Sequence, residues 1–365
     1  MIGGKKIAID ARMIEHSGIG TYIQNLLKSG VYDVAVGDKA IIRKYNKQIE
    51  VIEFKAKLYL AKEQFLFPVK KLIKQNVKLI HFPHYNVPYF CPIPFVVTVH
   101  DLIHFVYPEF LGGYMKRFYA KLLMKNALKE SKYIITVSNY SKKDIEKYFR
   151  INSDKIKVIY NVIDKEFRVK DQKEYQYLYN KYNISYDKKV LLCVGNMKPH
   201  KNIKEVLEAL ALMPNRNKTI LLLVGKAFES ENNLKELEKE LKITDSVIHT
   251  GFVKKEELVD LYNLADVFVF PSLYEGFGLP PLEAMSCGTP VICSNTSALP
   301  EVVGEAATLI SPGDPMNLMK KIEIVLFGDY ESKEHIEEGL EKVMEYSLEK
   351  NIILHTEAIE SVVIK

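Results

Sequence analysis

The sequence predicts an α/β protein with two Rossmann-like, doubly wound parallel sheets, and three observations support this fold class. The chain has 365 residues, which is too long for one ordinary core and enough for two domains of middle size. Short β-branched runs alternate with amphipathic stretches, once in the first half and again in the second. A polar, Tyr- and Lys-rich segment at 165–188 separates the two series. This double alternation is typical of two parallel sheets that helices cover on both faces.

The elements of each series follow one another in a regular order. In the first half we expect strands at 6–10, 77–82, 95–100 and 133–138, and helices near 19–29, 58–75, 114–131 and 141–149. In the second half we expect strands at 189–195, 219–225, 246–251, 266–272 and 290–295, and helices near 202–213, 231–242, 254–264, 279–286 and 315–326. Ligands of such sheets bind at the carboxyl ends of the strands, so we expect the functional site in a cleft between the two domains.

Composition narrows the class of protein. Hydrophobic residues make up 47% of the chain and charged residues 27%, which is sufficient for two cores. No apolar run reaches the roughly 18 residues of a membrane span, and the start MIGGKKIAID lacks the long apolar region of a secretory signal. The four cysteines lie far apart, so we expect reduced thiols. Together these features predict a cytoplasmic protein.

The charge is distributed unevenly along the chain. Residues 1–165 contain 28 basic and 14 acidic residues, whereas residues 166–365 contain 23 and 32. We therefore expect the first half to meet a polyanionic partner. The sequence contains no P-loop motif, no G-x-G-x-x-G after a strand, no D-x-D pair and no zinc-like histidine spacing. These absences argue against a P-loop nucleotidase, a dinucleotide enzyme and a carboxylate-bound or zinc metal site.

The strongest motif is the segment YEGFGLPPLEAMSCGTPVI at 274–292. Gly276 and Gly278 open a loop, and the prolines after them suit the first turn of a helix. Glycines let backbone N–H groups approach a ligand, and a helix N-terminus favours anions. Because Glu275 and Glu283 can accept hydrogen bonds from hydroxyls, the segment predicts binding of a phosphate or a polyol. A glycine-rich turn with a capping glutamate is the structural alternative.

The segment EGFGLPPLE resembles the E-x7-E signature of the retaining glycosyltransferases of family 4, which have the GT-B fold. Further matches to that family follow in order along the chain, at 10–27, 81–88, 97–109, 136–145, 158–164, 194–203, 251–258 and 346–350. The sequences of these motifs are most similar to those of bacterial enzymes that build lipopolysaccharide or capsule with mannose or related sugars. The resemblance implies an acceptor-side domain at 1–168, a nucleotide-sugar-binding domain at 169–345, and a C-terminal helix at 346–365 that packs back on the first domain.

The resemblance also assigns roles to individual residues. Glu283 is expected to bind the ribose hydroxyls of the nucleotide, and Glu275 the hydroxyls of the donor sugar. Backbone amides are expected to assist at Gly276, Phe277, Gly278 and Leu279. Two carboxylates at this spacing suit two polyols at either end of a diphosphate better than an acid and a base flanking one bond. The acceptor oxygen is expected to enter from the face that the diphosphate leaves, so no protein nucleophile is required and the leaving phosphate can serve as base.

Cleaving a sugar–phosphate bond without a metal requires cations near the departing diphosphate. Lys201, after the strand expected at 189–195, is placed to supply one. The family usually has an Arg-Lys pair here or an Arg just after the strand, whereas this chain has His200 and Asn196. We expect His200 or Lys198 to supply the second donor. A site with one cation fewer is one alternative, and a solvated surface lysine at 201 is another.

Residues of the first half complete the predicted site. Gly18 and Gly20 follow the first strand and open a helix, so their amides are expected to face the diphosphate. His100 ends a strand, and the resemblance implies that it reaches the donor sugar. Val253, in the second half, lies where relatives hold the base through backbone atoms. Three other histidines are expected to serve packing or the acceptor cleft: His81, His84 and His104.

Basic residues form a stripe on the helix expected at 114–131. The stripe consists of Arg117, Lys121, Lys125 and Lys129. Nearby cations surround an apolar run of Phe65, Leu66 and Phe67; they are Lys57, Lys62, Lys70, Lys71 and Lys74. Such faces predict contact with an anionic membrane surface, and an ordinary solvated surface is the alternative. Nucleic acid is not expected as a partner, because no aromatic residues are interleaved on the stripe.

These observations combine into one hypothesis with stated alternatives. We expect a retaining, metal-independent glycosyltransferase without a cofactor, which moves a hexose, preferably mannose from GDP-mannose, to an oligosaccharide or polyprenyl-diphosphate-linked acceptor of a cell-surface glycan. It is expected at the inner face of the cell membrane. A UDP-sugar-dependent GT-B transferase and a sugar-nucleotide epimerase are the enzymatic alternatives. A non-catalytic two-lobed sugar-binding protein is the alternative from another class.

Overall fold

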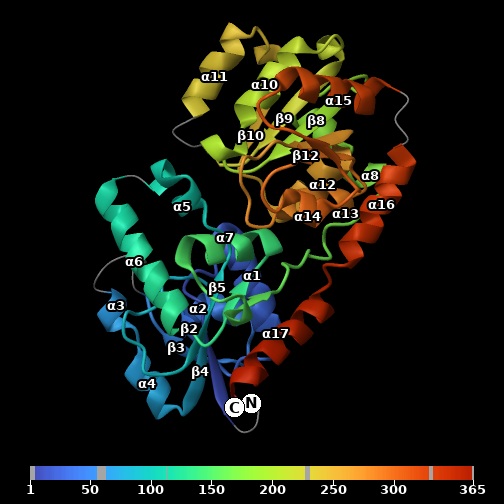
Figure 1. The fold of residues 1–365 in the computed structure, drawn as a ribbon. Helices are drawn as coiled ribbons and strands as arrows, with labels where there is room; N and C mark the ends of the chain where they lie inside the picture. Colours follow the sequence, from blue (N-terminus) through green and yellow to red (C-terminus); the bar gives the residue numbers. More distant parts are fainter. Residues whose placement is uncertain (1–4, 56–62, 112, 227–230, 329–331, 364–365) are drawn as a thin grey trace. The chain divides into compact units, whose positions relative to one another are not determined.

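The computed structural model divides the chain into two compact units. The first consists of Met1–Val162 with Ser347–Lys365, and the second of Ile163–Tyr346. The structure describes residues 5–55, 63–111, 113–226, 231–328 and 332–363. The chain therefore leaves the first unit, builds the second and returns with its last helix, α17 (Leu348–Val363), to the first (Figure 1).

The boundary between the units lies six residues before the position expected from the sequence, which was 168. Residues 163–168 belong to the second unit because their polar groups bind there. Lys255 donates to Asp164 Oδ2 (2.9 Å) and to Glu166 Oε1 (2.6 Å). Asn263 Nδ2 donates to the carbonyl of Arg168 (3.0 Å).

The first unit contains a seven-stranded, fully parallel sheet in the order β3-β2-β1-β4-β5-β6-β7. Its strands are β1 (Lys6–Asp10), β2 (Val34–Gly37), β3 (Glu50–Glu53), β4 (Val77–Phe82), β5 (Phe95–Val99), β6 (Ile134–Thr136) and β7 (Ile156–Val158). The four strands expected from the sequence are present. The sequence analysis missed β2, β3 and β7, which have only three or four residues each.

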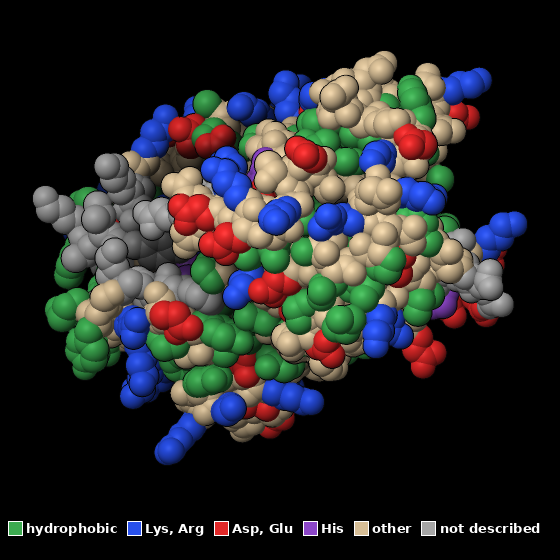
Figure 2. All heavy atoms as spheres, turned by 90° about the horizontal axis from the view of Figure 1, so that it is seen from above, with side chains coloured by type: hydrophobic (Ala, Val, Ile, Leu, Met, Phe, Trp, Pro, Cys, Tyr) green, Lys and Arg blue, Asp and Glu red, His purple; other side chains and the backbone are tan. Residues whose placement is uncertain are grey.

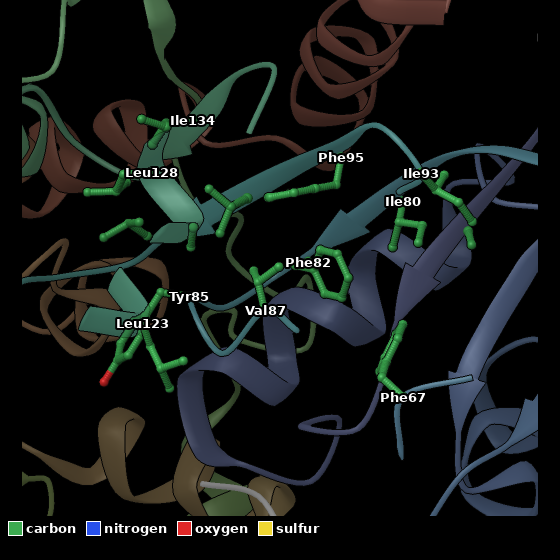
Figure 3. Packing of buried hydrophobic residues seen from close by; sticks show 14 of the residues in the cluster. Phe67, Ile80, Phe82, Tyr85, Val87, Ile93, Phe95, Leu123, Leu128 and Ile134 are labelled. Carbon is green, nitrogen blue, oxygen red and sulfur yellow. The ribbon is translucent and has the colours of Figure 1, made fainter. Parts of the chain in front are cut away.

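Successive residues of these strands pack into two different cores, as the two-residue period of a strand requires. In β1, Ile7 and Ile9 face a core shared with α1 (Ser17–Lys28) and α17, while Ala8 faces the opposite core. Figure 3 shows that opposite core, where side chains of β4 and β5 meet α6 (Tyr114–Glu130). The rings of Phe82 and Phe95 meet there edge to face, with centroids 5.5 Å apart.

The remaining helices of the first unit are short. They are α2 (Lys39–Tyr45), α3 (Glu63–Leu66), α4 (Val69–Lys74), α5 (Ile103–Val106) and α7 (Asn139–Phe149). The single helix expected at 58–75 is broken between α3 and α4, and its residues 58–62 lie outside the described residues. Pro68 stands immediately before α4, where its ring and missing N–H prevent a continuous helix.

The second unit contains a six-stranded, fully parallel sheet in the order β10-β9-β8-β11-β12-β13. Its strands are β8 (Lys189–Val194), β9 (Thr219–Val224), β10 (Val247–Gly251), β11 (Val267–Phe270), β12 (Val291–Ser294) and β13 (Thr308–Ile310). The predicted fold class, two Rossmann-like α/β units with parallel sheets, is confirmed.

Helices cover both faces of this sheet. They are α8 (Gln172–Tyr175), α9 (Tyr177–Lys181), α10 (Ile203–Leu212), α11 (Glu231–Glu240), α12 (Lys255–Leu264), α13 (Leu279–Ser286), α14 (Leu299–Val303), α15 (Pro315–Phe327) and α16 (Ser332–Met344). One core joins α10 and α15 to β8, β9 and β11. The polar segment at 165–188 carries α8 and α9, which bind α12 through Asp260: Lys170 Nζ donates to it at 2.6 Å and Tyr177 Oη at 2.9 Å.

None of the described helices is both long and apolar enough to span a bilayer. On the face drawn in Figure 2, basic and acidic side chains lie interspersed. The four cysteines are free thiols, and three of them, Cys193, Cys287 and Cys293, are buried.

Candidate functional site

The carboxyl edge of the second sheet brings Lys201 and Glu275 together. Lys201 ends a short turn after β8, and Glu275 follows β11. Because β8 and β11 are parallel neighbours, both loops leave the sheet at the same edge. Lys201 Nζ lies 2.5 Å from Glu275 Oε1, and the two side chains keep 16% and 15% of their surface exposed. The pair is thus held in the structure while both side chains stay partly exposed.

Serine hydroxyls and backbone groups fix the position of Glu275. Ser272 Oγ is 2.6 Å from Glu275 Oε1 and 3.1 Å from the carbonyl of His200. The backbone N–H of Glu275 donates to Ser297 Oγ (2.9 Å). Lys201 Nζ also lies 4.8 Å from the centre of the Phe270 ring, which favours a cation there. Sequence reasoning did not single out Ser272 or Ser297, because serines near a glycine-rich loop are common.

His200 contributes its backbone to this arrangement. Its carbonyl also accepts the N–H of Leu273 at 2.7 Å, which ties the loop after β11 to the turn after β8. The imidazole is buried, with 7% of the residue exposed. The expectation that His200 or Lys198 supplies a second donor stays a prediction.

The loop before α13 can be built only with glycine at position 278. Gly278 has a φ of +104°, and a Cβ on it would lie 2.6 Å from Leu299 Cδ2. The helix begins at Leu279 without a side-chain cap, and Pro280 and Pro281 follow. Since prolines carry no N–H, the donors that this helix start offers are the amides of the loop and of Leu279. These are the amides at Gly276, Phe277, Gly278 and Leu279 that the sequence predicted as donor contacts.

Glu283 lies one turn into α13, in a partly enclosed position. Tyr262 Oη donates to Glu283 Oε2 at 2.9 Å, which leaves Oε1 for another donor. Burial raises the pKa of Glu283 to about 7, and the charge of Asp164 acts in the same direction. Lys255 and the Tyr262 hydrogen bond act against that rise. The carboxylate therefore titrates near neutral pH, a perturbation that marks candidate functional residues.

Two further predicted residues lie at the same edge. Asn196 follows β8 and is partly buried; its carbonyl accepts the N–H of Lys198 at 2.7 Å. Val253 follows β10 and is also partly buried, next to Phe252, which is 71% exposed. Lys226, which follows β9, places its Nζ 5.2 Å from the centre of the Phe252 ring. The structure thus brings the predicted residues of the second unit to one edge of one sheet.

The remaining predicted residues belong to the first unit. His100 follows β5, and its Nε2 donates to the carbonyl of Pro83 at 2.9 Å. Burial lowers the pKa of His100, so the ring is neutral at pH 7 with Nδ1 unprotonated. Gly18 is exposed with open space around its Cα, whereas a Cβ on Gly20 would lie 2.5 Å from the carbonyl oxygen of Ile14. Gly20 is therefore required by close packing of α1, and Gly18 has no such requirement.

A buried chain of hydrogen bonds lies behind His100 and was not expected from the sequence. Tyr22 packs edge to face against His100, with ring centroids 4.9 Å apart. Tyr22 Oη is 2.7 Å from His355 Nε2 on α17 and 3.0 Å from Thr98 Oγ1. His81 Nε2 is 2.7 Å from Thr98 Oγ1. No sequence signal marks this network, because its members stand up to 333 positions apart.

The partners of the network fix the direction of every bond. His355 Nδ1 donates to the Asn351 carbonyl (2.9 Å), so its Nε2 accepts from Tyr22. Tyr22 in turn accepts from Thr98, which accepts from His81. Burial lowers the pKa of His355 to about 4 and that of His81 as well, so both rings are neutral. His81 thus has the packing role that was expected as one of its two possibilities.

A buried ionic cluster also ends β1. Arg12 Nη2 is 2.6 Å from Asp10 Oδ2, and Arg12 Nη1 binds Glu63 Oε1. The guanidinium lies 5.0 Å from the centre of the Phe67 ring. Asp10 and Arg12 lie within the segment 10–27 that resembles the family, but no role was predicted for either residue. An Asp-x-Arg pair directly after the first strand was the available signal.

The basic stripe on α6 is interleaved with exposed apolar side chains, two of them aromatic, so the expectation that no aromatic residues are interleaved on the stripe is wrong. Tyr114, Met115, Phe118 and Leu122 keep between 45% and 78% of their surface exposed. Lys121, Lys125 and Lys129 are exposed, and Arg117 is partly buried. Phe65 and Leu66 are exposed, but Phe67 is buried in the core, so its expected place on that face is wrong. Lys57 and Lys62 lie outside the described residues.

No group of three metal-ligating side chains gathers within the described part of the chain. The candidate site at the carboxyl edge of the second sheet consists of carboxylates, a lysine, hydroxyls and backbone amides.

Family models match most of the chain. The model named Glycosyltransferase Family 4 matches residues 38–167, and the model named Glycosyl transferases group 1 matches residues 177–343. The chain belongs to these glycosyltransferase families. The resemblance predicted from the sequence is thus confirmed.

Two relatives of this glycosyltransferase are bacterial O-antigen enzymes. The O-antigen chain mannosyltransferase B of Escherichia coli is 35% identical over 238 residues, which are 65% of this chain and 62% of the relative. The O-antigen chain mannosyltransferase RfbU of Salmonella typhimurium is 31% identical over 249 residues, which are 68% of this chain and 65% of the relative. The matched stretches thus span a little under two thirds of each relative's length.

Solved structures share the fold of this glycosyltransferase over nearly the whole chain. A glycosyltransferase from Rickettsia africae has a TM-score of 0.76 at 20% identity, covering 99% of both chains. Anabaena HepE in complex with UDP and glucose has a TM-score of 0.79 at 18% identity, covering 98% of this chain and 100% of that chain. At these identities the likeness establishes the GT-B fold alone.

Proposed function

We propose that the protein is a retaining glycosyltransferase that moves a hexose from a nucleotide sugar to an oligosaccharide or polyprenyl-diphosphate-linked acceptor. The observation that carries this proposal is the partly exposed Lys201–Glu275 pair at the carboxyl edge of the second sheet, on the same edge as Glu283. Opposite charges at one open strand edge suit a ligand that carries both hydroxyls and a diphosphate. Membership of the glycosyltransferase families supports the reaction class.

In this mechanism each side chain meets a different part of the donor. Glu283 accepts hydrogen bonds from the ribose hydroxyls, and the Tyr262 hydroxyl on its other oxygen orients it. Glu275 accepts from hydroxyls of the donor sugar, with Ser272 and Ser297 holding it in place. Lys201 neutralises the diphosphate as it departs, because a preorganised cation stabilises the charge that develops there.

The Lys201–Glu275 pair explains how such a site stays ready without its ligand. At 2.5 Å, each charge compensates the other and restricts its rotamers. A bound diphosphate gives Lys201 a second anion. The ammonium group can then shift its interaction from the carboxylate to the phosphate without a large side-chain movement. We propose that this arrangement works without a metal ion and without a cofactor. Transfer that persists in excess EDTA supports that part of the proposal, and loss that Mg²⁺ or Mn²⁺ restores contradicts it.

We propose that His100 and Gly18 of the first unit also bind the nucleotide sugar. The neutral His100 ring offers Nδ1 as an acceptor for a sugar hydroxyl, because its Nε2–H is committed to Pro83. The acceptor oxygen attacks the anomeric carbon from the face that the diphosphate leaves, and a leaving phosphate oxygen takes its proton. The new glycosidic bond therefore keeps the anomeric configuration of the donor.

Mannose from GDP-mannose is the donor that we propose. The support is the naming of two relatives, at 35% and 31% identity, as O-antigen mannosyltransferases. A UDP-sugar-dependent transfer is the main alternative, since the structure of HepE holds UDP and glucose. Thermal-shift screening against GDP-mannose and UDP-glucose separates these two possibilities by which nucleotide sugar raises the unfolding temperature.

Replacement of Glu275 tests the function directly. E275Q is expected to lower transfer of mannose by at least about a hundredfold, because the amide cannot pair with Lys201 or accept two hydroxyls. Mass spectrometry and NMR of the product measure the transfer and its anomeric configuration. The matched control is Glu305→Gln, an exposed glutamate of the same unit.

The outcomes separate the candidate functions. Near-normal transfer by E275Q contradicts the assignment of Glu275. Conversion of the nucleotide sugar to an isomer without acceptor indicates an epimerase. Donor binding without turnover for any acceptor supports a non-catalytic binding protein.

We also propose that the α6 stripe contacts an anionic membrane surface, where a polyprenyl-linked acceptor is held. The support is the combination of exposed Phe118 and Leu122 with exposed Lys121 and Lys125 on one helix. The double variant K121E/K125E is expected to reduce sedimentation with phosphatidylglycerol vesicles more than about tenfold, because each cation near the surface contributes. The control K44E/K47E changes charge equally on α2 and the loop after it. Equal binding by both variants contradicts the proposal.

A further inference from the structure

A large cavity lies at the amino edge of the first sheet, at the end of the strands remote from His100. Its volume is about 820 Å³. Five of its described lining residues stand at or near the starts of five adjacent strands: Lys5 precedes β1, Lys78 is the second residue of β4, Pro94 precedes β5, Lys132 precedes β6 and Lys155 precedes β7. Parallel strands place all these starts at one edge.

The position of the cavity separates it from the proposed donor site. Pro94 stands directly before β5, and His100 directly after it. Five residues of extended strand lie between them, which at about 3.3 Å per residue step places the two residues roughly 20 Å apart. No residue assigned above to the nucleotide sugar lines the cavity.

The charge of the lining is strongly positive. Four lysines face one carboxylate, that of Asp154, among the described lining residues. Within the described part of the chain, Lys78 and Lys132 form no ion pair. Both are exposed at the cavity. A concave surface of one sign concentrates counterions more strongly than a flat one.

The lysines of the cavity repel one another. Lys155 donates to the carbonyls of Leu128 (2.8 Å) and Lys129 (2.7 Å), which are open acceptors at the end of α6. Burial lowers the pKa of Lys155; the charge of Glu130 opposes this shift, and the charge of Lys132 adds to it. The two ammonium groups are thus close enough to interact unfavourably, a cost that a bound anion would remove.

One wall of the cavity combines a ring and a hydroxyl. Lys157 Nζ lies 4.6 Å from the centre of the Tyr133 ring and 3.3 Å from Ser361 Oγ on α17, and Tyr133 and Ser361 both line the cavity. A fifth cation therefore stands beside the lining. These two contacts restrict the Lys157 side chain, so less conformational entropy is lost when its ammonium group binds a ligand.

We propose that this cavity is a binding site for a phosphate group carrying two or more negative charges. The volume is that of a small-molecule site, and the lining supplies several ammonium donors in place of a single one. Such a group occurs both on soluble phosphorylated metabolites and on phosphomonoester lipid headgroups. The site is independent of the proposed donor site, so the two assignments can fail separately.

The test uses the full-length protein and sodium tripolyphosphate as the soluble probe. Isothermal titration calorimetry is expected to give saturable one-to-one binding that weakens as salt rises. The variant K78E/K132E is expected to bind at least about tenfold more weakly, because two attractive charges become repulsive. Lys155 is left unchanged, since it binds the end of α6. The control K44E/K47E makes the same charge change away from the cavity and is expected to bind as the natural chain does.

Vesicles that contain phosphatidic acid distinguish the two sources of phosphate. Loss of vesicle binding in K78E/K132E, with tripolyphosphate displacing the natural chain from vesicles, supports the site and assigns it to lipid headgroups. Unchanged vesicle binding in that variant, with tripolyphosphate binding lost, supports the site and assigns it to soluble phosphates. Absence of saturable tripolyphosphate binding to the natural chain, or equal loss in K44E/K47E, overturns the proposal. An unchanged thermal unfolding midpoint establishes that K78E/K132E is folded.

Discussion

The carboxyl edges of the two sheets are built from different kinds of interaction. In the second unit the edge carries an ion pair, Lys201–Glu275, with about a sixth of each side chain exposed. In the first unit the residue at the edge, His100, is neutral and packs against Tyr22, which belongs to a buried network of uncharged groups. The difference suggests a division of labour. We propose that the Lys201–Glu275 pair supplies charge for a ligand, whereas His100 in the first unit is an uncharged residue fixed by its packing.

The network behind His100 is also more sensitive to protonation than the ion pair is. A neutral buried histidine is stable only while it stays neutral, because a charged imidazole among apolar neighbours is strongly disfavoured. A partly exposed ion pair keeps access to water and tolerates wider conditions. The two units are therefore expected to respond differently to mutation and to pH.

The largest effect is expected from removing the cation of the second edge. Lys201→Met keeps the length of the side chain and deletes its charge, so kcat for transfer is expected to fall about 100- to 1000-fold. Steady-state kinetics with the nucleotide sugar measure this. The control is Lys204→Met, an exposed lysine paired only with Glu208 on α10. Similar kcat values for the two variants would show that the charge of Lys201 plays no part in the reaction.

The next effect concerns the neutral network of the first unit. The pKa of His355 is about 4 in the folded protein and near 6.5 when unfolded, so the unfolded chain takes up a proton first as pH falls. Stability is therefore fully present above pH 6.5 and is lost progressively down to about pH 4. The loss from this one group is about 3 kcal/mol.

Hydrogen–deuterium exchange of peptides from β4, β5 and α17 measures the loss within the first unit. Protection is expected to decrease between pH 6.5 and pH 4 once the intrinsic exchange rates are corrected. In His355→Gln that decrease is expected to be smaller, while in the exposed control His16→Gln it is expected to be unchanged. Identical pH dependence in both variants would contradict the role given to His355.

The smallest effect is expected at Glu283, a carboxylate in a partly enclosed position. Only the ionised carboxylate accepts with both oxygens, and its pKa is about 7, so lowering the pH from 8 to 6 is expected to raise KM for the donor about tenfold. Glu283→Gln is expected to show a flat profile. Tyr262→Phe removes a hydrogen bond that lowers the pKa of Glu283, so its midpoint is expected at higher pH. A pH profile that persists in Glu283→Gln would assign the titration to another group.

The sequence predicted the strands of the two cores because buried parallel strands are apolar along their whole length. KVLLCV in β8 and TILLLV in β9 are buried along nearly their whole length. The strands that were missed are short or lie away from the centre, such as β3, whose sequence EVIE has one buried residue. Edge strands carry polar residues on their open sides, so hydrophobic periodicity alone does not identify them.

Individual residues of the candidate site could be predicted from the sequence, but the hydrogen bonds that orient them could not. Glu275, Glu283 and Lys201 were identified from motifs, and the parallel order of β8 and β11 explains why two of them meet. Ser272 and Tyr262, which orient the two carboxylates, carry no motif of their own. The Tyr22–His355 bond depends on where α17 packs, and such a long-range contact has no local signature in the chain.

The return of the chain to its first unit has a consequence for biosynthesis. Ile359 on α17 is fully buried with β1 and α1, and His355 is buried beside Tyr22, so the core that β1 begins is complete only once α17 has been translated. The inserted unit has all of its strands available before then and can complete its fold first. Premature termination before residue 347 is therefore expected to destabilise the first unit, most of which precedes the second unit in the sequence.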